Sequence, residues 1–324
     1  MKKISRKGLL ILAAGLAAFP WLAKVVPGLG SYPEVMIYAG IYSLITMGLS
    51  VLVGFAGQIS LGHAAFFGIG AYASAVGTAT YNLDPWLCLI LGALLSLLVA
   101  LAIGVPTLKL KGHYLAMATL AFGIIVFIIF NEEVDITGGP DGLSRIPGLS
   151  LFGLKLNTTM SYFYFVWTVV LLVFWFCANL LESRIGRAFR AVHGSEVAAM
   201  AMGINISSHK VQAFVLSAVL ASLAGSLYVH YINFINPSTC NLFFSVKLII
   251  MIVMGGTHSL WGAILGAVLI TFLSNVWLHA FQEWEVLIYG AVLLIIVIFL
   301  PDGLAGLPEK IKGWAGRGQP GKAS

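Results

Sequence analysis

The sequence predicts an all-α polytopic membrane protein of about ten transmembrane helices. Of its 324 residues, 60% are hydrophobic and only 9% are charged, whereas soluble domains carry about 25% charged residues. Apolar runs long enough to cross a hydrocarbon layer about 30 Å thick recur along the chain. These runs must be helical, because lipid offers no hydrogen-bond partner to a bare backbone N–H or C=O.

The apolar runs place the predicted helices in order. The first, 8–23, follows four basic residues as a signal peptide would, but we expect it to be retained because the chain then re-enters the membrane repeatedly. For the segments 59–79 and 244–262, the sequence does not decide between a full span and a re-entrant loop. In the second segment, the apolar run 244–254 has only eleven residues, which is short for a span. The other predicted spans are 35–53, 86–108, 114–130, 162–181, 211–231, 263–279 and 286–300.

The predicted loops differ in charge. The N-terminus, residues 109–111, the loop 182–210 and the tail together hold fourteen of the eighteen Lys and Arg residues, while the opposite loops hold three. Because positively charged loops stay in the cytoplasm, both termini and the loop 182–210 are predicted to be cytoplasmic, and the loop 131–161 to lie outside. The net charge of +6 then reflects this topology and anionic lipid, and not nucleic acid.

This topology divides the chain into three parts. A basic segment with the first helix occupies 1–34, the helical core 35–303, and the tail 304–324. Lys247 is the one basic residue inside a predicted span. We expect its ammonium to reach an interface or to cap a carbonyl, and a role in a transport pathway is the alternative.

Motifs for catalysis and energy conversion are missing from the sequence. It has no lysine followed by Ser or Thr, which excludes a GxxxxGK[ST] phosphate loop. It places no acidic residue in the middle of a predicted span, where an ion-coupled carrier usually needs one. Its three cysteines include no CxxC pair. We therefore expect no catalytic, cofactor-binding or metal-binding residues, and either an energy source on another polypeptide or a passive channel.

The basic loop 182–210 contains a predicted short helix. Ser195 can cap a helix that begins at Glu196, and Gly203 is a plausible stop. Two interpretations remain open: the helix lies on lipid, which the neighbouring arginines favour, or it docks a soluble partner. The side chains that share its apolar face are Val197, Met200 and Ala201.

Glycines and isolated polar residues mark two further segments. Gly62, Phe66 and Gly70 recur at helical spacing, which predicts a strip of small residues for close helix packing. A lone histidine at such a place is more often a packing residue than a ligand, and we expect this of His63. The other segment, 254–262, contains Gly255 and Gly256 and is predicted to turn sharply between two spans. The polar residues at the mouth of the first helix are Gln58, Ser60 and His63.

Four motifs in order carry a resemblance to a known family. They are GFAGQISLGHAAFFGIGAY (54–72), TGGPDGLSRIP (137–147), GRAFRAV (186–192) with EVAAMAMGI (196–204), and MGGTHSLWGAILGA (254–267). Together they resemble the ATP-binding cassette (ABC) permeases for branched-chain amino acids, of the LivH/LivM type, over about 38–303. The long outer loop is more similar to the LivM type.

The resemblance implies an ABC importer permease bundle in the bacterial inner membrane. Its implied partners are a second permease subunit in a heterodimer, two cytoplasmic ATPase subunits, and a periplasmic or extracellular substrate-binding protein. It implies an ATPase coupling loop that includes Arg187, Arg190, Glu196, Ala198, Ala199 and Gly203. It implies a helix-packing or pathway role for Gly54, Gly57, Gln58, Ser60, Gly62, His63, Gly70, Gly255 and Gly256.

The coupling motif of the family is matched with one departure. Family loops carry Glu-Ala-Ala with a glycine four residues after the final alanine. Here Ala198, Ala199 and Gly203 keep that spacing, but Val197 stands where the glutamate would be and Glu196 lies one position earlier. The resemblance therefore supports a coupling surface whose ionic contact differs from the family pattern.

The resemblance leaves the substrate open between related classes. Branched-chain amino acids are the expected substrates, and urea or a short-chain amide is the alternative. A stand-alone solute channel, which would conduct without an ATPase, is an alternative of another class.

Overall fold

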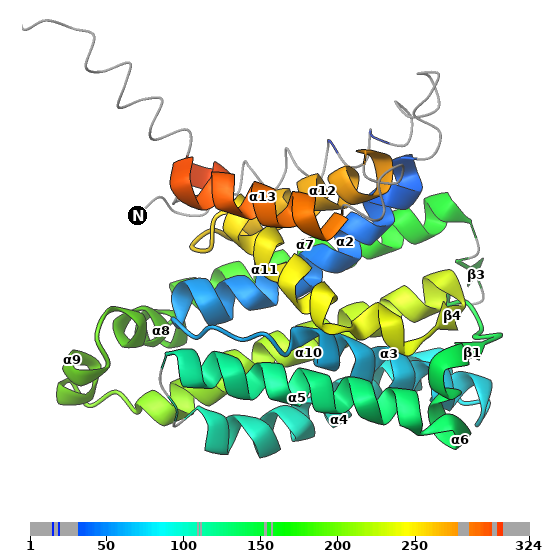
Figure 1. Ribbon diagram of the computed structural model, residues 1–324, viewed down its shortest axis with the longest axis horizontal. Helices are drawn as coiled ribbons and strands as arrows, with labels where there is room; N and C mark the ends of the chain where they lie inside the picture. The colour runs from blue at the N-terminus through cyan, green and yellow to red at the C-terminus, as the bar shows by residue number, and fades with distance from the viewer. Residues whose placement is uncertain are drawn as a thin grey trace, which may run out of the picture.

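The computed structural model describes residues 15, 19, 32–108, 110, 112–151, 154–156, 158–277, 285–299 and 303–306. The predicted first helix, 8–23, lies outside these residues except for Gly15 and Phe19, and so does the tail beyond 306. The long helices run side by side, with α8 and α9 at one end and the short strands at the other (Figure 1). We call these the basic end and the strand end.

The first half of the bundle alternates between the two ends. Helix α2 continues into the π-helix η1, and the chain then returns as an extended trace to α3. Figure 1 shows this part of the chain in shades of blue. The elements are α2 (Tyr32–Leu49), η1 (Ser50–Phe55), α3 (His63–Ala79), α4 (Pro85–Thr107), α5 (His113–Glu132), α6 (Val134–Thr137), η2 (Gly139–Asp141), β1 (Leu143–Ser144), β2 (Ser150–Leu151) and β3 (Leu154–Lys155).

The second half begins with the longest helices and ends with shorter ones. Its elements are α7 (Thr159–Glu182), α8 (Arg184–Gly194), α9 (Glu196–Ala201), α10 (Ile206–Ile232), β4 (Phe234–Ile235), η3 (Pro237–Cys240), α11 (Leu242–Gly255), α12 (Leu260–Phe272), η4 (Leu273–Trp277), α13 (Glu285–Phe299) and η7 (Leu304–Gly306). Strand β1 pairs with β4 and β2 with β3, both antiparallel. The β1–β4 pair ties the outer loop to the end of α10.

The all-α membrane class is confirmed. Six helices of 19 to 27 residues are long and apolar enough to span a membrane. Three others, α3, α12 and α13, have 17, 13 and 15 residues. The predicted number of about ten spans is therefore loose, because these three helices barely reach, or fall short of, the length needed to cross the hydrocarbon layer.

Polar caps fix where many of the helices begin. Each cap accepts a hydrogen bond from an otherwise unpaired N–H of the first turn, which contributes about 1 kcal/mol. Asp84 does this for α4, where Pro85 also presets the first backbone angle. The other side-chain caps are Thr158, Ser183, Ser195, Asn205, Asn241 and Ser259.

The predicted span 59–79 differs from the structure at its start. Residues 56–62 are not helical, and α3 begins only at His63. Gly57 has a φ of +70°, which opposes continuation of the helix at this point. The second uncertain segment, 244–262, covers most of α11, the turn after it and the start of α12. The chain reaches α11 through the short strand β4 and the 3-10 helix η3, so both α3 and α11 are entered through a stretch that is not α-helical.

Candidate functional site

The predicted helix at the basic end is present as α9, and its apolar face is exposed. Ser195 accepts a hydrogen bond from Ala198 N at 3.3 Å, and Gly203, with a φ of +80°, follows its last turn. Val197 and Met200 are 74% and 61% exposed, whereas Ala199 is 2% exposed. The helix therefore sits on Ala199 and presents an apolar face outward, as the sequence predicts. Such a face at a polar end of the molecule is typical of a protein-binding surface.

An ion pair attaches α9 to the bundle. Lys210 Nζ lies 2.6 Å from Glu196 Oε1, and Lys210, in the first turns of α10, is buried. A buried charge needs a partner, so this pair fixes the start of α9 against α10. The sequence analysis missed Lys210, because fourteen residues separate it from Glu196 and no helical spacing relates them.

The two predicted coupling arginines turn toward the bundle. Arg187 donates to the carbonyl of Glu182 at 3.0 Å, and Arg190 to that of Leu181 at 3.0 Å. These carbonyls belong to the last turn of α7, where cations are favourable. The arginines thus fasten α8 to the end of α7.

Helix α8 also contacts two segments that lead into the membrane. The His193 ring lies 5.4 Å from the His258 ring in an edge-to-face arrangement. A Cβ on Gly57 would lie 2.6 Å from His193 Nδ1. Partial burial, and secondly His258, lowers the pKa of His193. We call His193, Gly57 and His258 the histidine junction.

The turn 256–259 is bound to η1 beside this junction. Ser50 Oγ donates to the Thr257 carbonyl at 2.8 Å, and a side chain on Gly54 would overlap that carbonyl. The structure thus places Gly57 against α8 and Gly54 against the turn 256–259. The sequence analysis did not single out His193 or His258, since they are sixty-five positions apart.

The polar residues before α3 form a buried network. His63 is 1% exposed, with Nδ1 3.2 Å from Ser60 Oγ and Nε2 against Ser217 Oγ on α10. The Leu61 N–H donates to Thr119 Oγ1 on α5 at 3.0 Å. Both ring nitrogens of His63 therefore have a serine hydroxyl as partner within the bundle. Gln58 is also buried, and its amide has no hydrogen-bond partner among the described residues.

The prediction that Gly62 and Gly70 lie in one packing strip is wrong, because the two glycines contact different helices. A Cβ on Gly62 would lie 2.6 Å from the Thr119 carbonyl of α5, whereas one on Gly70 would overlap the Ser222 carbonyl of α10. Gly62 precedes α3 as its cap residue, so helical spacing does not relate it to Gly70. Gly255 lies in a different close contact, where its Cα faces the Gly262 carbonyl. Gly256, with a φ of +110°, makes the turn between α11 and α12.

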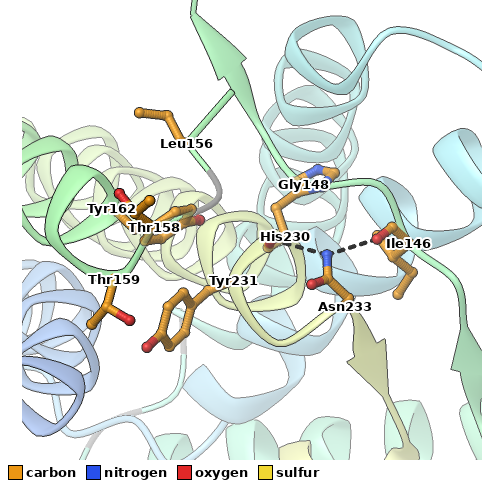
Figure 2. A pocket seen from close by; sticks show the side chains of 9 residues that line it. All are labelled: Ile146, Gly148, Leu156, Thr158, Thr159, Tyr162, His230, Tyr231 and Asn233. Atoms are coloured by element: carbon orange, nitrogen blue, oxygen red, sulfur yellow. Dashed lines mark hydrogen bonds between the residues drawn. The ribbon is translucent and has the colours of Figure 1, made fainter. Parts of the chain in front are cut away.

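A pocket of about 460 Å³ opens at the strand end. Figure 2 shows Thr158, Thr159 and Tyr162 on one side, Asn233 and Ile146 on the other, and Tyr231 and His230 between them. Hydrogen bonds hold the outer loop at this pocket: Asn233 Nδ2 donates to the Ile146 carbonyl at 2.7 Å, and His230 Nδ1 lies 2.8 Å from the Pro147 carbonyl. Its lining in the described part contains no Asp, Glu, Lys or Arg.

Metal ligands do not gather in the described ranges, where no group of three His, Cys, Asp or Glu residues could hold an ion. At the basic end, the Glu196–Lys210 ion pair and the histidine junction connect α9 to α10 and α8 to the turn 256–259.

The chain was compared with known proteins. A family model described as branched-chain amino acid transport system / permease component matches residues 31–297. The high-affinity branched-chain amino acid transport system permease protein LivM of Salmonella typhimurium is 32% identical over 340 residues, covering 97% of this chain and 79% of that protein. LivM of Escherichia coli is 32% identical over 305 residues, covering 86% and 72%. LivH of Salmonella typhimurium is 27% identical over 290 residues, covering 83% and 92%. No solved structure matches the chain significantly.

Proposed function

The chain belongs to the family of branched-chain amino acid transport permeases, and from this membership we propose that it is a membrane subunit of an ATP-driven importer for leucine, isoleucine and valine. It is a multi-pass protein of the bacterial inner membrane. With a second permease it forms the translocation pathway. Two ATPase subunits bind at the basic end, and a substrate-binding protein delivers the amino acid at the strand end. Hydrolysis of ATP takes place on the ATPases.

The exposed apolar face of α9 is the observation that carries this proposal. Val197 and Met200 project from the end of the bundle that carries the arginines. If α8 and α9 lay on lipid, the arginines would be expected to face anionic headgroups. Arg184 and Arg187 are exposed, but Arg187 and the half-buried Arg190 each donate to a carbonyl of α7. This arrangement supports a docking helix over a lipid-bound one.

The contacts of α8 and α9 give a route for movement. A displacement of α9 reaches α10 through the Glu196–Lys210 ion pair. A displacement of α8 reaches η1 and the α11–α12 turn through the histidine junction. Closure of the ATPases on ATP would therefore move α10, η1 and the α11–α12 turn.

Reconstitution tests the proposal as a whole. We expect labelled leucine to enter liposomes only when ATP, the second permease, the ATPases and the binding protein are all present. Uptake by the chain alone down a gradient would establish a channel instead. ATP-dependent uptake of urea but not leucine would keep the mechanism and overturn the substrate.

The docking surface is tested by one arginine at a time. Met200→Arg is expected to abolish uptake and ATPase binding while the chain stays in the membrane, because a charge on a desolvated interface loses its hydration. Tyr114→Arg, at a 71% exposed position on α5, is the matched control and should leave uptake unchanged. Ala199→Arg is a poorer test, because Ala199 is buried within this chain. Normal uptake by Met200→Arg would favour lipid contact for α9.

The orientation proposed for the chain places the basic end and both termini in the cytoplasm. Ser150 and Ser208 are both exposed, and they belong to the outer loop and to the start of α10. Introduced one at a time as cysteine, after replacement of the three native cysteines, they should react with an impermeant thiol reagent from opposite sides. Labelling of both from one side would contradict the topology.

A further inference from the structure

The strand end of the bundle carries a surplus of exposed carboxylates, at the starts of α2 and α4 and between α5 and β1. The outer loop and the end of α5 offer only Arg145 and Lys155 against them. The field of this end is therefore negative, which attracts a basic partner surface and repels an acidic one. The exposed carboxylates are those of Glu34, Asp84, Glu132, Glu133, Asp135 and Asp141.

His230 is the buried polar residue of the pocket at this end. It is 2% exposed, and its Nδ1 donates to the Pro147 carbonyl at 2.8 Å. A carbonyl only accepts, so Nδ1 carries a proton and Nε2 of the neutral ring keeps its lone pair. Nε2 has no hydrogen-bond partner among the described residues. A buried acceptor without a partner is unfavourable, so the pocket fits a ligand that supplies a donor.

Tyrosine rings and one carboxylate lie on another side of the same pocket. Tyr162 and Tyr231 line it with their ring centres 4.9 Å apart, and Tyr38 packs edge-on against Tyr231 at 5.7 Å. Glu34, one turn before Tyr38 on α2, interacts electrostatically with Tyr38 and Tyr231. Aromatic faces and carboxylates both attract cations. This side of the pocket therefore favours a positively charged group.

We propose that the pocket receives a lysine or arginine side chain of the substrate-binding protein, whose cationic group donates to His230 Nε2. The inference rests on the proposed function and names the contact by which that partner docks. The aliphatic stem of the side chain packs on Tyr231 and Leu156, and Glu34 beside Tyr231 offsets its charge. The volume of about 460 Å³ lies in the usual range of ligand pockets, about 300–1,000 Å³.

The lining favours a protein side chain over a free amino acid. A leucine molecule brings a carboxylate together with its ammonium, and the described lining residues include no lysine or arginine to pair with that carboxylate. A carboxylate without a partner is unfavourable in such a pocket, and Glu34 also repels it. A lysine or arginine side chain brings the cation alone. The negative field of the strand end acts in the same direction.

The first experiment measures the concentration of leucine-loaded binding protein that gives half-maximal ATP hydrolysis by the complete transporter in liposomes. His230→Asn offers an amide N–H to the Pro147 carbonyl and removes the Nε2 acceptor. The concentration is expected to rise about ten-fold, which corresponds to the loss of one charge-assisted hydrogen bond, while the maximal rate persists. Glu34→Gln should raise it as well. Glu133→Gln, the same change of charge at an exposed position outside the lining, is the matched control and should stay near the parent value.

A second experiment determines the sign of the partner's charge. Thr159 lines the pocket in the first turn of α7. Thr159→Lys should weaken docking, whereas Thr159→Glu should retain or strengthen it. A helix N-terminus itself favours glutamate over lysine, so thermal unfolding of both variants in detergent separates folding from docking. Weaker docking of Thr159→Glu beside normal docking of Thr159→Lys would assign the pocket to an acidic partner and overturn the proposal.

The partner residue is found by a double-mutant cycle. Surface lysines and arginines of the binding protein are replaced one at a time by glutamine, and one replacement should weaken docking to the parent transporter but not to His230→Asn. The absence of such a residue, or an unchanged response of His230→Asn beside a responsive parent, would overturn the site. A shift in the leucine concentration required, and not in that of the binding protein, would assign the pocket to free substrate and also overturn it. A parent transporter that does not respond to the binding protein would instead count against the proposed function.

Discussion

The bundle contains two breaks, and they are filled in opposite ways. The first, 56–62, leads from the basic end to His63 and is closed by side chains, since His63 meets both Ser60 and Ser217. The second, 233–241, leads from the strand end to α11 and borders a cavity that contains Lys247. The same device, a helix entered through a stretch that is not α-helical, thus occurs once filled by side chains and once beside a cavity.

The difference indicates separate duties for the two breaks. At the first, Thr119 and Ser245 accept the backbone N–H groups of Leu61 and Ala64 at 3.0 and 3.2 Å. Those contacts join α5 and α11 to the end of the break and the start of α3, and Gly57 at the other end of the break lies against His193. The first break is thus filled by contacts that tie it to neighbouring helices, while the second borders a cavity.

The largest expected effect comes from introducing a leucine into α3, the helix that follows the first break. Gly70→Leu would place a side chain on the Ser222 carbonyl of α10, and the backbones would have to separate. We expect a loss of about 3 kcal/mol or more in stability, with failure to assemble with the partner permease. Gly290→Leu is the control on the cavity side, where a Cβ meets nothing within 4 Å. Equal losses of thermal stability in detergent would remove the distinction between the two sides.

Removal of His63 tests the seal directly. His63→Ala leaves the Ser60 and Ser217 hydroxyls without their partner in a buried site, which costs about 1–3 kcal/mol. Gln58→Leu at the same break should be neutral or stabilising, because the buried amide makes no hydrogen bond within the described part of the chain. Thermal unfolding of the two variants in detergent gives the comparison. A larger loss in Gln58→Leu would point to a partner for Gln58 in the assembled transporter.

Local features of this comparison could be predicted from the sequence. Ser195 and Gly203 bound α9 through cap and stop preferences that depend only on neighbouring residues. The apolar runs likewise located the helices, because such a run is defined by neighbouring residues alone. The non-helical character of 56–62 was left open, because an apolar run does not by itself distinguish a helix from a buried extended segment.

Long-range contacts could not be predicted. The pairing of Glu196 with Lys210, and of His193 with His258, depends on how α8, α9 and α10 pack. Gly62 and Gly70 illustrate the same limit, since their spacing fits one helix face and yet α3 begins between them. The sequence placed Lys247 inside a predicted span, but its hydrogen bond to Ser274 and the cavity beside it form only when α11, η4, α13 and the second break come together.

A cap at the second break should affect transport more than stability. Asn241→Ala removes the cap of α11 and is expected to cost about 1 kcal/mol. Asp84→Ala removes the cap of α4 at a similar cost and is the matched control, because Asp84 lies away from the cavity. Leucine uptake by the complete transporter should fall in Asn241→Ala only. Equal uptake in both variants would mean that Asn241 serves α11 alone.

The smallest expected effect is a pH dependence of the histidine junction at the basic end. Burial and the neighbouring His258 lower the pKa of His193 below its ordinary value of 6.5, so the packed arrangement favours the neutral ring. While the ring is neutral in every state, the lowered pKa carries no free-energy cost. The cost appears as the pH falls below 6.5, because protonation of His193 then opposes its contact with Gly57 and His258. Uptake per ATP hydrolysed should therefore decline modestly, by less than about two-fold, as the pH on that side is lowered from 7 toward 5.5. The decline should vanish in His193→Gln and persist in His113→Gln, at the start of α5. A profile that is the same in all three proteins would place the pH dependence elsewhere and leave the histidine junction as simple packing.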